Sequence, residues 1–413
     1  DRTMPGLSGG ETVAELRRLR PDVRIVLASG YSEERAAIDR VVKSGRYTIG
    51  PEVAAFEEAF AAYHGKKHAV MVNSGSSANL IAIAALFHKK NKPLERGDEV
   101  IVPAVSWSTT YHPLQQYGLK LRFVDVELET LNIDTGALKD ALTPQTRAIV
   151  AVSILGNPAN LTAVRAFADD HGLYFLEDNC ESLDAELPGK SGGQKTGTFG
   201  DVGTFSFFFS HHISTGEGGM VVTDEDELNG LALAIRAHGW IKDVPKDSRL
   251  FEASEDSFAE AYRFVIPGYN VRPQEINAAV GREQLKKLPA MTSQRRANLA
   301  RFQELFGDDE RFIIPRENGK SSSFCFPMIV SPEARFERSD VFEPLKDAGI
   351  GFRMITGGCF PRHDAIRFFD YDCVGDLANA NLVHDCGFFV GNHPFDLRPQ
   401  IERLHDVLIG LGG

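Results

Sequence analysis

Short apolar runs alternate with amphipathic stretches along most of the chain between residues 34 and 288. The apolar runs have the length of buried strands and predict strands at residues 68–72, 100–102, 123–126, 148–152, 174–176, 203–209 and 219–223. Helical spacing of apolar residues marks several stretches between them, for example residues 53–63 and 161–171. Strands that alternate with helices predict an α/β fold with a mainly parallel sheet covered on both faces.

The pattern changes after residue 288. A long helix is expected at residues 293–305, and shorter strand and helix signals follow it. A chain of 413 residues is long enough for two domains. We therefore expect a large domain at residues 34–288 and a smaller α+β C-terminal domain at residues 289–413.

The start of the chain does not match this alternation. Its opening Asp-Arg-Thr-Met-Pro-Gly, an amphipathic stretch and an apolar strand resemble the middle of a phosphoacceptor receiver domain, with Asp1 as the phosphorylated aspartate and Ser29 as the switch hydroxyl. The acidic pair and the lysine strand of that family are absent, and half a sheet cannot bury its own apolar face. We interpret residues 1–33 as a fusion or gene-boundary remnant; a working phospho-switch is the alternative.

Composition and charge limit the kinds of molecule that this chain is expected to bind. A net charge of -12 without a long basic run argues against nucleic-acid binding. No apolar stretch reaches the roughly 18–20 residues of a membrane span, and no secretory signal opens the chain, so we expect a cytoplasmic protein. The five cysteines are scattered and form no Cys-x-x-Cys pair, which predicts free thiols and no metal site.

Two short motifs place polar groups at the ends of predicted strands. Ser74, Gly75 and Ser76 follow one strand and precede a helix, where backbone N–H groups and the helix dipole favour an anion. Many helix N-caps read this way, so the motif alone is not specific. Asp178 ends another strand, at the edge where parallel sheets bind ligands. It could cap a helix or hold a protonated pyridine nitrogen.

The most specific motif is the run at residues 197–219, which ends in Thr-Gly-Glu-Gly-Gly. Here the chain, from about residue 35 onward, resembles the sugar-nucleotide aminotransferase family (DegT/DnrJ/EryC/StrS type). Members bind pyridoxal 5'-phosphate on the aspartate-aminotransferase fold, fold type I of the PLP-dependent transferases. In that family a lysine five residues before the first glycine of this turn binds the cofactor covalently. That position is His211 in this chain, and no lysine lies between residues 195 and 242 to replace it. The neighbouring His212 is expected to point elsewhere, as on an extended backbone.

The resemblance implies an unusual reaction for the family. Without the lysine, pyridoxamine 5'-phosphate would be held non-covalently, and His211 would move protons, as imidazole can near neutral pH. Two groups of the family carry this histidine. The iron–sulfur-dependent group has a cysteine cluster, whereas this chain has no cysteine between Cys180 and Cys325. The other group needs no metal and removes the 3-hydroxyl of GDP-linked 4-keto-6-deoxy-D-mannose in the colitose pathway.

The match to the metal-free group extends to residues 103–111, 210–215, 236–240 and 267–273. It implies a lyase, a 3-dehydratase of a nucleotide-linked 4-keto-6-deoxy sugar in deoxysugar and O-antigen biosynthesis. His211 would act first as base and then as acid. L-glutamate would be the amino donor that restores the aminated cofactor.

The resemblance also implies contacts for further residues. The expected cofactor contacts are Gly75, Ser76 and Ser206 at the phosphate, Asn270 arriving there from the partner subunit of a homodimer, Trp107 on the pyridine face, Asp178 at the ring nitrogen and Glu181 near the ring hydroxyl. The expected substrate contacts, at the nucleotide phosphates or the sugar, are His238, Lys242 and Arg272. An ordinary core tryptophan is the alternative for the ring contact, and solvated surface charge is the alternative for the substrate contacts. Gly351 stands where the family often has Glu, so the resemblance leaves the sugar side of the pocket open.

Two other functions stay open at this point. One is a transaminase of keto sugars that tolerates His211. The other is a non-catalytic cofactor-binding protein with a regulatory role through its receiver-like segment. The retained Asp178, Glu181 and Ser206 argue against a decayed site.

Overall fold

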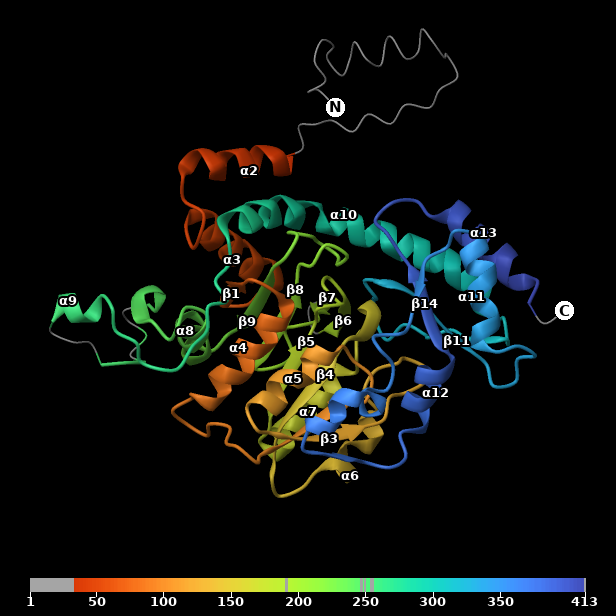
Figure 1. The fold of residues 1–413 in the computed structure, drawn as a ribbon, viewed down its shortest axis with the longest axis horizontal. Helices are drawn as coiled ribbons and strands as arrows, with labels where there is room; N and C mark the ends of the chain where they lie inside the picture. The colour runs from red at the N-terminus through yellow and green to blue at the C-terminus, as the bar shows by residue number, and fades with distance from the viewer. Residues whose placement is uncertain (1–32, 190–191, 246–247, 249, 253–255, 412–413) are drawn as a thin grey trace, which may run out of the picture.

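The computed structural model describes residues 33–189, 192–245, 248, 250–252 and 256–411 (Figure 1). The receiver-like segment expected at residues 1–33 therefore lies outside the described residues, except for its last position. That residue begins helix α2 (Glu33–Ser44).

Eight strands form the large sheet, in the order β1-β9-β8-β5-β4-β2-β3-β13. They are β1 (His68–Val72), β2 (Glu99–Pro103), β3 (Lys120–Val124), β4 (Thr146–Val152), β5 (Tyr174–Asp178), β8 (Val202–Ser206), β9 (Gly219–Thr223) and β13 (Tyr371–Cys373). All neighbours are parallel except β9, which runs antiparallel to β1 and β8. The predicted mainly parallel sheet is confirmed. The strand predicted at residues 203–209 ends earlier, at Ser206.

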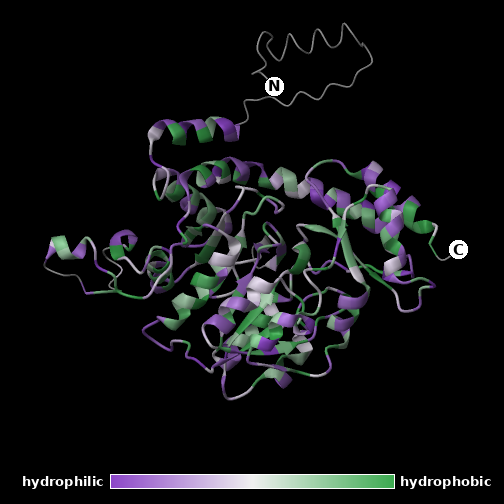
Figure 2. Cartoon of the chain, viewed as in Figure 1, coloured by the Kyte–Doolittle hydropathy of each residue, from purple (hydrophilic) through white to green (hydrophobic). Residues whose placement is uncertain are grey.

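Helices cover both faces of this sheet. Alternate residues of a strand point to opposite faces: in β4, Val150 and Val152 share a core with α4 (Gly75–Phe87) and α8 (Asp226–Ile235), whereas Ile149 and Ala151 share one with α7 (Leu161–His171). Figure 2 shows the central strands as mostly apolar. Burial on both faces explains why these strands are continuous apolar runs in the sequence.

A smaller, four-stranded antiparallel sheet lies beside the large one, in the order β10-β11-β14-β12. Its strands are β10 (Phe312–Ile313), β11 (Cys325–Val330), β14 (Gly387–Gly391) and β12 (Phe352–Arg353), packed against α11 (Arg338–Asp347), α12 (Ala378–Cys386) and α13 (Arg398–Ile409). This arrangement confirms a smaller α+β part at the C-terminal side.

Helix α10 (Glu275–Phe306) joins the two parts of the molecule. It lies along α2 and α3 (Pro51–His64) at one end and along α13 at the other (Figure 1). The helix is continuous across residues 288 and 289, where we predicted the domain boundary. The position of that boundary stays a prediction. The helix predicted at residues 293–305 is its second half.

The remaining elements are short connections around these layers. They are α5 (Ser108–Gln116), α6 (Leu138–Ala141), α9 (Ser257–Glu260), the hairpin β6 (Glu186–Gly189) and β7 (Gly192–Lys195), and the 3₁₀ helices η1 (Thr135–Ala137), η2 (Ile154–Gly156), η3 (Ile241–Asp243), η4 (Phe360–Arg362) and η5 (Asp364–Phe368). Among the described residues, none of the helices is long and apolar enough to cross a bilayer.

The buried carboxylate of Glu275 fastens α10 to the start of α3. It accepts hydrogen bonds from the backbone N–H groups of Gly50, Glu52 and Val53, at 2.8, 3.0 and 2.9 Å. These are the N–H groups that a helix N-terminus leaves without partners. We expect Glu275→Ala to lower the free energy of unfolding by about 1–2 kcal/mol, measured as a lower urea midpoint. The exposed Glu304→Ala on the same helix is the control, and equal effects of the two changes would contradict this role.

Candidate active site

A cavity of about 360 Å³ lies where the carboxyl ends of β1, β5 and β8 meet the smaller sheet. This is the size of a small-molecule site, at the sheet edge where α/β proteins bind ligands. Its lining residues are Ser74, Gly75, Ser76, Ser106, Trp107, Thr109, Val152, Asp178, Cys180, Glu181, Ser206, Phe208, Ser210, His211, Glu217, Phe324, Arg353, Met354, Thr356 and Phe389. The cavity therefore brings together seven of the predicted residues: Gly75, Ser76, Trp107, Asp178, Glu181, Ser206 and His211.

The N-terminus of α4 forms one end of the cavity. Ser74 caps this helix, accepting a hydrogen bond from Ser77 N at 3.1 Å. A Cβ atom on Gly75 would lie 2.5 Å from Ser206 Cβ and 2.9 Å from Cys180 Sγ, so only glycine lets the helix start this close to Ser206. Backbone N–H groups, the helix dipole and hydroxyl groups thus converge at one point, as a phosphate requires.

Asp178 lies at the end of β5 and is held by three donors. Its Oδ2 accepts from Asn79 Nδ2 and from Thr110 Oγ1, both at 2.8 Å, and its Oδ1 accepts from Cys180 N at 3.1 Å. Asn79 is fixed in turn by Thr204, whose hydroxyl donates to Asn79 Oδ1 at 2.5 Å. Three donors fix a carboxylate at the cavity wall, where it can accept a further proton-bearing nitrogen.

Asn79, Thr110 and Thr204 were not identified from the sequence. A signal existed for one of them, because Asn79 is a buried amide inside the otherwise apolar helix α4. Buried polar side chains need partners, so an asparagine at this point indicates a polar contact across the helix–sheet interface.

His211 lies in the turn between β8 and β9, with its N–H bonded to Phe208 O at 2.9 Å. Its imidazole packs edge-to-face against Phe324, with ring centroids 5.4 Å apart at 90°. Its Nδ1 is buried without a hydrogen-bond partner. Burial lowers the pKa of His211 to about 4. The imidazole is therefore neutral at neutral pH, with one of its two nitrogens unprotonated.

His212 points away from the cavity, as predicted. Its Nε2 lies 3.2 Å from Ser322 O, and it is not among the lining residues. The reason differs from the predicted one, because His211 and His212 lie in a bend and not on an extended backbone.

Glu181 is the second ionisable group in the cavity with a shifted pKa. Its Oε2 accepts a hydrogen bond from Leu155 N at 2.9 Å. Burial raises the pKa of Glu181 to about 7, against this hydrogen bond, and the charge of Asp178 raises it further. The cavity therefore holds a histidine that resists protonation and a glutamate that resists ionisation, a combination typical of proton-transfer sites.

The raised pKa of Glu181 leads to a prediction about how the stability of the protein depends on pH. The folded state holds this proton up to about pH 7, whereas an unfolded glutamate releases it near its ordinary value of 4.5. Ionisation in the folded state is therefore unfavourable, and Glu181 lowers stability progressively as pH rises from about 4.5 to 7. We expect Glu181→Gln to raise the Tm of the cofactor-free protein at pH 8 and to leave it unchanged at pH 4.5. Equal Tm differences at the two pH values would contradict the shift.

Trp107 lies at the rim of the cavity, in front of α5, with 60% of its surface exposed. The alternative reading as a core tryptophan is therefore wrong. An exposed flat ring at a cavity mouth is available for stacking on a bound ring.

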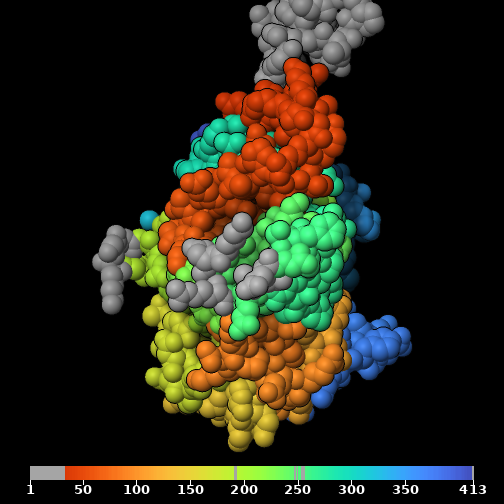
Figure 3. Space-filling model, turned by 90° about the vertical axis from the view of Figure 1, so that its left-hand side faces the viewer, coloured from red at the N-terminus to blue at the C-terminus, as the bar shows by residue number. Residues whose placement is uncertain are grey.

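The other predicted contacts do not line the cavity of this chain. Asn270, His238, Lys242 and Arg272 lie between α8 and α10, in an excursion formed by the described residues of 236–272. Its helix α9 projects from the body (Figure 1), on the side that Figure 3 turns toward the viewer together with α2. Asn270 Oδ1 accepts from Arg272 Nε at 3.0 Å. Lys242 Nζ lies 4.8 Å from the ring centroid of Trp240. Their predicted roles stay predictions.

Comparison with known proteins identifies the class to which this fold and cavity belong. The chain is a member of the DegT/DnrJ/EryC1/StrS aminotransferase family, whose model matches residues 29–387. It is 46% identical to the GDP-4-keto-6-deoxy-D-mannose 3-dehydratase of Yersinia pseudotuberculosis, over 95% of this chain and 100% of that protein.

Solved structures agree. The E. coli GDP-4-keto-6-deoxy-D-mannose-3-dehydratase with bound hydrated PLP superposes with a TM-score of 0.89 at 45% identity, over 94% of this chain and 99% of that one. A GDP-4-keto-6-deoxymannose-3-dehydratase with a trapped PLP-glutamate geminal diamine gives the same score and identity, over 94% and 100%. The predicted fold of the PLP-dependent transferases is confirmed.

Proposed function

We propose that this chain is a PLP-dependent GDP-4-keto-6-deoxy-D-mannose 3-dehydratase that uses pyridoxamine 5'-phosphate and L-glutamate. The observation that carries the proposal is His211, a neutral imidazole with an unpartnered buried nitrogen, at the position where the family has its covalent lysine. None of the described residues that line the cavity is a lysine. The similarity to the two dehydratases above supports the substrate and the cofactor.

The cavity fits the cofactor. The close approach of Gly75 to Ser206 at the start of α4 would hold the phosphate, Asp178 the protonated ring nitrogen, and Trp107 the face of the ring. When bound, the cofactor supplies an amine that attaches to the sugar ketone and a ring that accepts electrons from it.

The protein supplies the proton transfers. His211 would take a proton from the methylene carbon of the cofactor because its ring is neutral at neutral pH. The imidazolium that results would donate that proton to the C3 hydroxyl oxygen as it departs. Phe324 and Phe208 border the imidazole and keep water from it. Asp178 would stay paired with the protonated ring nitrogen while His211 moves the proton.

The exposed residues of the excursion support a homodimer with shared active sites. Asn270, Lys242 and His238 are exposed and lie outside this chain's own cavity. In the dimer, Asn270 of the partner subunit would reach the cofactor phosphate. His238, Lys242 and Arg272 would meet the nucleotide phosphates or the sugar.

The proposed place of the enzyme is deoxysugar biosynthesis for O-antigen lipopolysaccharide, in the cytoplasm. A protein named as a lipopolysaccharide biosynthesis protein in Salmonella typhimurium is 32% identical over 87% of this chain. The five cysteines are all free thiols in the structure, which fits a reducing compartment.

The test is mass spectrometry of GDP-4-keto-6-deoxymannose after incubation with the protein, PLP and L-glutamate. Loss of one oxygen from the sugar is the expected result. Replacement of the ketone by an amine would show a transaminase instead and would overturn the role of His211. A sugar that returns unchanged would overturn the proposed substrate.

A further inference from the structure

Arg295 is a buried cation on α10, with 3% of its surface exposed. Its guanidinium donates to three backbone oxygens, those of Ser323 at 3.5 Å, Phe324 at 3.2 Å and Asn392. Within the described part of the chain, no carboxylate forms an ion pair with it. A buried charge without a counter-charge is costly, so its retention needs a reason other than stability.

Two of the three oxygens that Arg295 binds, those of Ser323 and Phe324, belong to one tightly held segment, residues 321–324. Ser323 has a left-handed backbone, with φ of 46°. Asn392 Nδ2 donates to Ser323 O at 3.1 Å and to Ser323 Oγ at 2.9 Å. Burial on all sides lets the segment keep this strained conformation.

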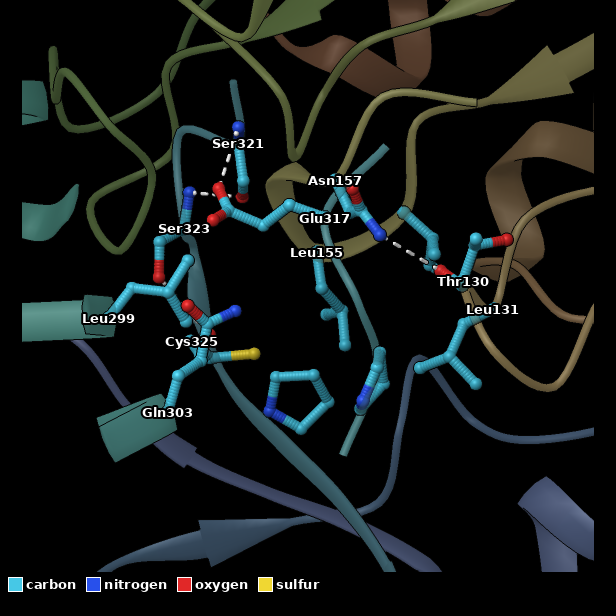
Figure 4. A pocket seen from close by; sticks show the side chains of 13 residues that line it. Thr130, Leu131, Leu155, Asn157, Leu299, Gln303, Glu317, Ser321, Ser323 and Cys325 are labelled. Carbon is cyan, nitrogen blue, oxygen red and sulfur yellow. Dashed lines mark hydrogen bonds between the residues drawn. The ribbon is translucent and has the colours of Figure 1, made fainter. Parts of the chain in front are cut away.

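Segment 321–324 also pairs with η2. Phe324 N donates to Leu155 O at 3.0 Å, and Ser322 N donates to Gly156 O at 2.9 Å. Figure 4 shows Ser321, Ser323, Leu155 and, from α10, Leu299 among the residues that line a cavity of about 30 Å³. A space this small holds about one water molecule, so the segment has little room to move away from α10.

The segment reaches the active site at two points. The Phe324 ring lies edge-on to His211 and 5.9 Å from the ring of His212. Leu155, bonded to Phe324, donates its N–H to Glu181. One segment anchored by Arg295 therefore contacts both His211 and Glu181.

The charge of Arg295 acts in the same direction as burial on His211. Burial lowers the pKa of His211 most; a backbone hydrogen bond at Ser206 and the charge of Asp178 raise it, and the charge of Arg295 lowers it. Arg295 also lowers the pKa of the neighbouring His212. The other ionisable groups that face His211 from the cavity wall are Cys180, Glu181, Glu217 and Arg353.

We propose that Arg295 is a positioning residue for His211: it fixes Phe324 edge-on to the imidazole and, by its unpaired charge, keeps that imidazole neutral. The inference rests on the proposed function of His211 as the base. Arg295 itself does not line the cavity.

The test is a titration of the His211 ring by NMR in the full, cofactor-free chain with labelled histidines, its signal assigned by loss in His211→Asn. Arg295→Met removes the charge and the hydrogen bonds, and Arg295→Lys keeps the charge. We expect the pKa of His211 to rise by roughly 0.5–1 pH unit in Arg295→Met and to stay in place in Arg295→Lys. The acid limb of kcat/KM for dehydration should move to higher pH by the same amount in Arg295→Met only.

Arg296→Met is the matched control. Arg296 is the next residue on α10 and also binds the segment, donating to Ser321 O at 2.8 Å. It should leave the His211 titration unchanged. Lower activity of Arg295→Met without a shift in the titration would overturn the proposal and make Arg295 merely structural. If Arg295→Met does not fold, Arg295→Gln takes its place with the same expectation. The titration needs no turnover, so it is independent of whether dehydration is the reaction.

Discussion

Replacement of His211 by asparagine is expected to lower kcat for loss of the C3 hydroxyl by about 100- to 10,000-fold, the usual range for removal of a general acid–base group. Asparagine is smaller than histidine and polar, and its amide has no basic nitrogen. The buried Nδ1 that has no partner in the protein is the atom that this change removes. The measurement is the single-turnover rate of oxygen loss from the sugar with the protein preloaded with pyridoxamine 5'-phosphate.

His212→Asn is the control, because His212 lies one residue away but bonds to Ser322 O outside the cavity. It should keep most of the activity. His211→Lys supplies the family's covalent group and should give a visible absorbance band with pyridoxal 5'-phosphate while dehydration is lost. Dehydration that survives either change at His211 would mean that another residue is the base.

Asp178→Asn is expected to lower kcat by about 100- to 1,000-fold, the cost of removing one fixed electrostatic contact from a reacting group. The amide loses the negative charge beside the ring nitrogen. It also brings an NH₂ group to a point where Asn79, Thr110 and Cys180 all donate hydrogen bonds. Because an NH₂ group cannot accept hydrogen bonds, some of these buried donors would lose their partner. The cavity wall would then be less well fixed, so the affinity for the cofactor should fall as well. The measurements are kcat and cofactor binding followed by absorbance.

Asp201→Asn is the comparison for this change. Asp201 is also an aspartate of the large sheet: it directly precedes β8 and accepts a hydrogen bond from Phe175 N at 2.7 Å. It does not line the cavity. Its replacement should affect stability more than turnover. Equal losses of kcat in the two variants would show that Asp178 acts through the fold and not through the cofactor.

Local sequence pattern predicted most of the large sheet. The bounds of β1, β9 and α7 match the predicted ones, because strands buried on both faces and a capped amphipathic helix leave strong local signals. The pairing of β13 with β3 leaves no local signal in the sequence. Its three residues come from the C-terminal part of the chain and pair with a strand more than two hundred positions earlier. The continuity of α10 was also missed, because it runs through Pro289, and a proline usually marks the end of a helix.

The candidate site divides in the same way. The motif residues Gly75, Asp178, Ser206 and His211 follow strands of one sheet, and parallel strands bring their carboxyl ends to one edge. Phe324, Arg353 and Phe389 come from the smaller sheet, and nothing in their local sequence places them at that edge. Which small-domain side chains close a cavity depends on how two sheets pack, and no short-range pattern encodes this.

The turn that carries His211 has an evolutionary consequence. It is held at both ends by strands that pair with each other, β8 and β9, and by the backbone hydrogen bond from His211 N to Phe208 O, which does not involve the side chain at position 211. A lineage could therefore exchange lysine for histidine there without disturbing the core, and pass from transferring an amino group to removing a hydroxyl. Ancestral enzymes with either residue would share one scaffold, so sequence similarity across the family says less about reaction type than this one position does.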